Sequence, residues 1–123
     1  MPEGVERLKK RADFLRVAGV RRKWATPGLV LQAARDPSCA DAGRLRVGFT
    51  ATKKTGNAVC RNRIKRRLRA IADDLLPLYA QRGWDYVLIG RRSTINRDFD
   101  ALRQDLCIAL KKVGAYVDEA PDA

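Results

Sequence analysis

The alternation of apolar and polar positions is clearest in residues 44–52. Every second side chain in this segment is apolar, and the positions between them are polar or glycine. A period of two is typical of a strand with one buried face. The apolar face would consist of Leu45, Val47, Phe49 and Ala51. Residues 84–90 form a second, almost continuously apolar run, which predicts a strand at the centre of a sheet.

Residues 20–35 are interrupted by Pro27-Gly28, a dipeptide typical of turns. The segments on either side, 20–25 and 29–35, therefore predict a hairpin. The first segment is polar apart from Val20 and Trp24, so both an edge strand and a loop remain open for it.

A helical period begins after Asn57, a residue that can cap a helix. Apolar residues recur there at gaps of four, four, three and four, which places them on one face. This stripe consists of Cys60, Ile64, Leu68, Ile71 and Leu75. We expect Pro77 to end or bend the helix near Leu76. Two further helices are predicted, one over 13–18 that stops at Gly19 and one over 98–113.

These elements predict one α+β domain with helices packed on a sheet, in the order helix, strand, strand, strand, helix, strand, helix. The length of 123 residues fits a single domain, and 46% hydrophobic residues can supply its core. The sequence contains no internal repeat and no linker to a second domain. We expect residues 1–10 and 116–123 to be flexible.

The charge balance points to a polyanionic partner. The chain has 26 Lys and Arg against 14 Asp and Glu, a net charge of +12, and residues 42–72 hold ten Lys or Arg and no acid. In the predicted helix, cations lie opposite the apolar stripe and like charges stand four residues apart, which costs stability without a polyanion. RNA, DNA and an acidic membrane surface are all open on charge alone, and an ordinary solvated face is the plainer alternative.

Protein-centred catalysis is disfavoured. The chain has no His, and its Asp and Glu residues form no cluster of suggestive spacing. Three widely spaced cysteines, Cys39, Cys60 and Cys107, suit neither a disulfide framework nor a zinc site. No segment approaches the ~20 apolar residues of a membrane span or has the form of a secretory signal. We therefore expect a cytoplasmic protein with no metal site of its own.

The basic segment also carries a resemblance. Leu45-Arg46-Val47-Gly48-Phe49, then Lys53-Lys54, then the run from Gly56-Asn57-Ala58-Val59 to Arg61-Asn62-Arg63 resemble the signature of the bacterial ribonuclease P protein. A weaker match extends from Lys9 to Val113. The resemblance implies a left-handed β-α-β crossover, as in the second domain of ribosomal protein S5. It also implies a catalytic RNA subunit that requires Mg²⁺, while the protein itself binds no cofactor and is not catalytic alone.

The resemblance further implies two RNA contacts and a 1:1 complex. The basic helix would dock on the catalytic RNA, and a cleft between the first helix and a sheet face would hold the 5′ leader of precursor tRNA. The implied docking residues are Lys53, Lys54, Asn57, Arg61, Asn62, Arg63, Lys65, Arg66 and Arg69. The implied leader residues are Phe14, Leu29, Leu31, Gln32, Arg46 and Thr50. Family clefts commonly carry aromatics at the positions of Ala18 and Gln32, so this chain is expected to rely more on charge and hydrogen bonds.

Several alternatives remain at this stage. A general RNA-binding or ribosome-associated protein of the same fold would share the basic helix. An autonomous metal-dependent nuclease lacks the carboxylates it would need. A sequence-specific DNA regulator is disfavoured because the basic helix lies between strands rather than after a partner helix. Phe14 is as readily a core residue as a cleft residue; Trp84 is expected to pack, and Trp24 could pack or stack on a base.

Overall fold

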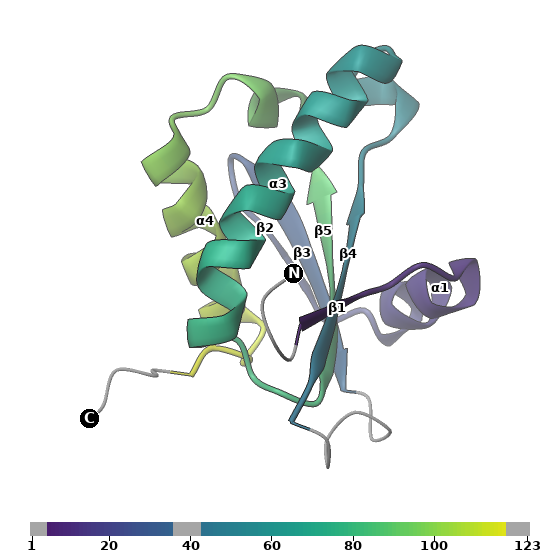
Figure 1. The fold of residues 1–123 in the computed structure, drawn as a ribbon, viewed down its shortest axis with the longest axis vertical. Helices are drawn as coiled ribbons and strands as arrows, with labels where there is room; N and C mark the ends of the chain where they lie inside the picture. The colour runs from purple at the N-terminus through teal and green to yellow at the C-terminus, as the bar shows by residue number, and fades with distance from the viewer. Residues whose placement is uncertain (1–4, 36–42, 118–123) are drawn as a thin grey trace.

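A five-stranded mixed sheet forms the centre of the molecule (Figure 1). The computed structural model describes residues 5–35 and 43–117. The strand order is β1-β4-β5-β3-β2; β1, β4 and β5 are parallel, and β3 runs antiparallel to both β5 and β2. The elements in chain order are β1 (Val5–Arg7), α1 (Arg11–Val20), β2 (Lys23–Ala25), β3 (Leu29–Arg35), β4 (Leu45–Thr50), the 3₁₀ turn η1 (Lys53–Thr55), α3 (Ala58–Tyr79), β5 (Trp84–Gly90), the 3₁₀ turn η2 (Arg92–Ile95) and α4 (Phe99–Lys112).

The main hydrophobic core lies between the sheet and the two long helices, α3 and α4. The predicted stripe of α3 is confirmed, because Ile64, Leu68 and Ile71 are fully buried, although Cys60 at its beginning is only half-buried. On α4, Leu102, Leu106 and Leu110 are buried. Burying one such side chain contributes about 1.5–3 kcal/mol. This layer therefore fixes the orientation of α3, whose opposite side faces outward.

Helix α1 covers the other face of the sheet (Figure 1). Its contact is small, since Val17 is the only residue of α1 that is buried. The ring of Phe14 lies directly over Gly48 of β4, where an added Cβ would approach the ring to 2.5 Å. Only a glycine at this position lets α1 approach the sheet so closely.

The crossover from β4 through α3 to β5 is left-handed, as the resemblance implies. In Figure 1, α3 lies in front of the sheet, and β5 lies to the left of its parallel neighbour β4. A right-handed crossover, the rule for parallel β-α-β units, would place β5 on the right.

Strand β1 is absent from the predicted order. It pairs in parallel with β4, Val5 with Leu45 and Arg7 with Val47, and both Val5 and Leu8 are buried. The expectation of a flexible N-terminal segment is therefore wrong for residues 5–8. Residues 1–4 and 118–123 lie outside the described part of the chain. At the other end Tyr116 forms a bridge with Ala80, so the described start of the predicted flexible tail is also attached.

Two helices end one to three residues beyond the positions where the sequence predicted an end. Helix α3 continues through Pro77 to Tyr79. A proline in the last turn removes only one helical N–H donor, and the last carbonyls of a helix lack helical donors in any case. Helix α1 continues past Gly19 to Val20. Its left-handed cap is Arg21, with φ 65°, whose N–H donates to the Ala18 carbonyl.

Candidate RNA interface

The start of α3 is set by Gly56 and Asn57. Asn57 caps the helix as predicted, its Oδ1 accepting a hydrogen bond from the N–H of Cys60 at 3.0 Å. Gly56 has φ 141°, a conformation that strains other residues, and an added Cβ would lie 2.9 Å from the Cys60 Cβ. This pair begins the helix at a defined residue. It therefore determines which side chains of α3 face outward.

Cations cover the outward side of α3, and we call this surface the basic helix face. Within residues 5–35 and 43–117, none of its cations forms an ion pair with an acid. An ordinary solvated helix face would mix signs and gain pairs four residues apart. The charge on this face therefore remains uncompensated within the described chain. The basic helix face consists of Arg61, Asn62, Arg63, Lys65, Arg66 and Arg69.

Two surface hollows shape the basic helix face. The first is lined by Val59 together with Asn62, Lys65, Arg66 and Arg69. The second lies toward α4 and is lined by Arg63, Arg66, Arg67, Ala70 and Phe99. Arg66 lines both hollows and is exposed, so it stands on the ridge between them. A phosphate backbone could follow either side of this ridge.

The predicted lysines extend the face beyond the helix. Lys53 and Lys54 are exposed in η1, just before α3 begins. The guanidinium of Arg92, which follows β5, donates to the Lys54 carbonyl at 3.0 Å, whereas that of its neighbour Arg91 donates to the Thr26 carbonyl at 2.9 Å. The sequence analysis missed Arg92. The only signal was a basic pair directly after a predicted central strand. The place of Arg92 beside η1 follows from the parallel pairing of β4 and β5.

Arg67 is a cation of α3 that makes contacts within the protein. Its guanidinium donates to the Arg97 carbonyl and lies over the ring of Phe99, 5.7 Å from the centroid. Arg67 therefore connects α3 to the segment before α4.

The predicted leader residues divide between the two faces of the sheet. Phe14, Gln32, Arg46 and Thr50 lie on the side of α1, and we call this surface the α1 face. Leu29 and Leu31 are fully buried in the main core under α3 and α4. Their assignment to the leader cleft is wrong, because side chains alternate along β3 and the neighbour of an α1-facing Gln32 must point the other way.

An ion network closes the α1 face. The Nε and Nη2 atoms of Arg46 donate to Asp85 at 2.8 and 2.7 Å, and Arg16 of α1 donates to the same carboxylate. Arg46 also lies 3.6 Å from Asp13 of α1. The Asp85 side chain is fully buried between these arginines. The charge of Arg46, predicted to hold the leader, is therefore balanced by acids of its own chain.

The two tryptophans play different parts. Trp84 packs as predicted, with 7% of its surface exposed. Trp24 remains 42% exposed, and the Lys112 Nζ lies 5.2 Å from the centroid of its ring. Trp24 pairs with Leu31, which points under the helices, so Trp24 lies on the α4 side of the sheet and away from the α1 face.

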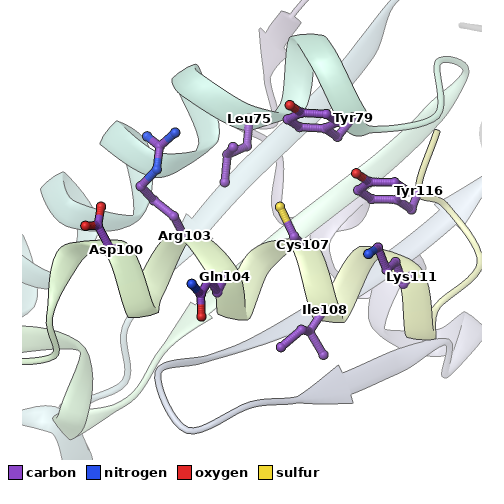
Figure 2. A pocket seen from close by; sticks show the side chains of 9 residues that line it. All are labelled: Leu75, Tyr79, Asp100, Arg103, Gln104, Cys107, Ile108, Lys111 and Tyr116. Atoms are coloured by element: carbon purple, nitrogen blue, oxygen red, sulfur yellow. The ribbon is translucent and has the colours of Figure 1, made fainter. Parts of the chain in front are cut away.

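A larger hollow lies between the second half of α3 and α4, and Figure 2 shows its side chains. Tyr79 and Tyr116 stack there with centroids 5.5 Å apart, and burial raises the pKa of the nearby Cys107 thiol. The charges are mixed, since Arg103 forms an ion pair with Asp74 and Asp100 also lines the hollow. This mixture separates it from the basic helix face.

The described part of the chain contains neither a cluster of metal ligands nor a membrane-spanning helix. No three His, Cys, Asp or Glu side chains gather there as they would around a metal ion. None of its helices has the length and apolarity of a membrane span.

Comparison with known proteins identifies the family to which this chain belongs. The ribonuclease P family model matches residues 3–114. The chain belongs to the ribonuclease P protein family. A ribonuclease P protein component of Paramagnetospirillum magneticum is 55% identical over 127 residues, covering 99% of this chain and 96% of the relative. Another, of Ruegeria pomeroyi, is 51% identical and covers 91% and 89%.

Solved structures of ribonuclease P proteins share the fold. The protein of Staphylococcus aureus gives a TM-score of 0.72 at 26% identity, covering 90% of this chain and 97% of that one. The protein of Thermotoga maritima gives 0.67 at 27% identity, covering 82% and 91%. The predicted α+β class is thus confirmed. Family membership makes the chain an RNA-binding subunit of ribonuclease P with a role in tRNA processing, and a general RNA-binding role is not favoured.

Proposed function

We propose that the basic helix face docks this subunit on the ribonuclease P RNA, while the α1 face contacts the 5′ leader of precursor tRNA. The observation that supports docking is a row of cations on a rigid helix without acid partners in the described chain. The proposed docking residues are Lys53, Lys54, Asn57, Arg61, Asn62, Arg63, Lys65, Arg66 and Arg69.

The residue types suit contact with a phosphate backbone. The planar guanidinium of arginine matches two phosphate oxygens, and lysine adds a compact charge. The amide of Asn62, exposed among these cations, can bind sugar hydroxyls or base edges. The Oδ1 of Asn57 is used by the helix cap, so only its amide nitrogen is left to contact RNA.

We place the catalytic centre on the RNA. The chain contains no His, and an acid cluster that could hold catalytic metal ions is missing from the part of the chain that is described. Mg²⁺ bound by the RNA would stabilise charge on the reacting phosphate. The protein would lower the Mg²⁺ requirement by neutralising phosphates that crowd together in the folded RNA.

The proposed leader contacts are Phe14, Gln32, Arg46 and Thr50. Phe14 is half-buried, so part of its ring is available for stacking on a base. Gln32 and Thr50 offer hydrogen-bonding side chains on the same face. The complex would contain one protein for each RNA and act in the cytoplasm.

Reconstitution tests this proposal. The protein, the ribonuclease P RNA and precursor tRNA are mixed at low Mg²⁺. Cleavage of the precursor and affinity for the ribonuclease P RNA are measured with wild type, Arg66→Gln and Arg103→Gln. Arg103 is a matched control because it already forms an ion pair with Asp74. We expect stimulation by wild type and by the control, and about tenfold weaker RNA binding by Arg66→Gln.

Three results would contradict parts of the proposal. Equal RNA affinity of Arg66→Gln and wild type would remove the basic helix face from the docking surface. Cleavage of precursor tRNA by the protein in the absence of the ribonuclease P RNA would place the catalytic centre on the protein. Equal stimulation for precursor tRNA with a leader of several nucleotides and for precursor tRNA with a leader of one nucleotide would remove the α1 face from substrate binding.

A further inference from the structure

Phe49 of β4 lies beneath two arginines from different elements. The Cζ of Arg7, in edge strand β1, is 5.3 Å from the centroid of the Phe49 ring. The Cζ of Arg69, in α3, is 5.9 Å from the same centroid. Phe49 is 7% exposed, so its ring is nearly buried where the two guanidiniums lie over it. The negative face of an aromatic ring attracts cations, which gives each arginine a defined position.

Neither arginine has an acid partner in the described residues. Two positive charges that share one ring repel each other unless an anion joins them. The Nε of Arg69 is also buried without a hydrogen-bond partner. At the same edge of the sheet Arg44 is paired, its Nη1 lying 2.8 Å from Glu6. Glu6 therefore compensates the charge of Arg44, while no described acid, Asp73 of α3 included, forms an ion pair with Arg7 or Arg69.

We infer that Arg7 and Arg69 together bind the phosphate backbone of the ribonuclease P RNA, which extends the basic helix face onto β1. This inference rests on the proposed docking of that face. Strand register supports the choice of RNA. Arg7 pairs with Val47, whose side chain is buried under the helices, so Arg7 lies on the α3 side of the sheet and not on the α1 face. A phosphate here would satisfy two cations that the described chain leaves uncompensated.

The test compares Arg7→Gln with Arg44→Gln. Both variants lose one positive charge from the same sheet edge, but Arg44 already has an acid partner. Binding to the ribonuclease P RNA alone and to precursor tRNA alone is measured over a range of salt concentrations. We expect Arg7→Gln to bind the ribonuclease P RNA about tenfold more weakly. We also expect the slope of log K against log salt to fall by about one, with Arg44→Gln like wild type.

Arg7→Lys provides a second variant. It keeps the charge and loses the planar fork, so the salt slope should stay near wild type while affinity falls less than in Arg7→Gln. Thermal unfolding of each variant shows whether β1 remains paired.

The outcomes separate this inference from the proposed function. If Arg69→Gln and Arg66→Gln weaken binding but Arg7→Gln does not, the inference is overturned and the docking proposal stands. If none of the three weakens binding, both fail. A loss confined to precursor tRNA would overturn the assignment of this site to the ribonuclease P RNA.

Discussion

The basic helix face and the α1 face contain the same kinds of cation in opposite circumstances. On the helix, arginines and a lysine stand four residues apart, and none of them forms an ion pair with an acid of the described chain. On the α1 face, Arg16 and Arg46 converge on the buried carboxylate of Asp85. The first arrangement costs stability in the free protein and gains from a polyanion, whereas the second holds α1 on the sheet. The number of cations in a segment therefore does not measure the charge that it offers to RNA.

The salt dependence of RNA binding should separate the two faces most strongly. Raising salt from about 50 to about 200 mM should lower the affinity for the ribonuclease P RNA by about a thousandfold, because condensed counterions compete with the basic helix face. The buried network around Asp85 is screened much less, so the urea midpoint of unfolding should hardly move. Filter binding and urea titration at both salt concentrations measure this. A change in affinity below tenfold would contradict the phosphate-contact account.

Removing the shared acid should test the other side of the comparison. Asp85→Asn leaves Arg16 and Arg46 without their carboxylate, and we expect it to cost about 3 kcal/mol of unfolding free energy in urea titration. Asp100→Asn is the control, since Asp100 is exposed at the start of α4 and should change stability by less than about 0.5 kcal/mol. Equal stability of the two variants would show that the network contributes little to the attachment of α1.

A pair of glycine substitutions should show how closely α1 must approach the sheet. Gly48→Ala places a Cβ against the Phe14 ring, and we expect a loss of about 1–3 kcal/mol and a weaker preference for leader-bearing substrate. Gly19→Ala lies inside α1 with nothing within 4 Å of its added Cβ, so it should stabilise the protein by about 0.5–1 kcal/mol. Thermal unfolding and competition between precursor and mature tRNA measure these effects. Opposite signs in the two variants are the expected result, and matching signs would contradict the close contact.

The smallest expected effect concerns the start of the basic helix. Asn57→Ala removes the side-chain cap of α3 and should cost about 1 kcal/mol of stability. RNA affinity should fall only severalfold, because the cations further along α3 remain in place. Asn57→Ser restores a cap and should recover most of the stability. If Asn57→Ser lost as much RNA affinity as Asn57→Ala, direct RNA contact by Asn57 would outweigh its role as a cap.

Local patterns were sufficient for much of the fold and of the docking surface. The alternation in residues 45–50 and the helical stripe from Ile64 to Leu75 each depend on neighbours within a few positions, and both predictions are confirmed. The outward position of Arg66 follows from that stripe. Strand β1 could not be predicted in this way, because three residues show no clear period and their partner strand lies about forty positions later.

The errors on the α1 face have the same cause. Alternation along β3 shows that Leu29 and Leu31 share a face, but the choice of face depends on where α3 and α4 pack. Local spacing likewise gave no sign of the ion pair between Arg46 and Asp85, which lies 39 positions later.

By itself, the sequence determined the type of most elements, the uncompensated charge along α3 and the resemblance that names its family. These properties arise from residues close together in the chain, whose spacing fixes which side chains share a face. Only the tertiary structure decided which face of each strand is buried, which cations are neutralised and that Arg7 and Arg69 both lie against the ring of Phe49. Those outcomes depend on contacts between distant segments, and local spacing carries no information about them.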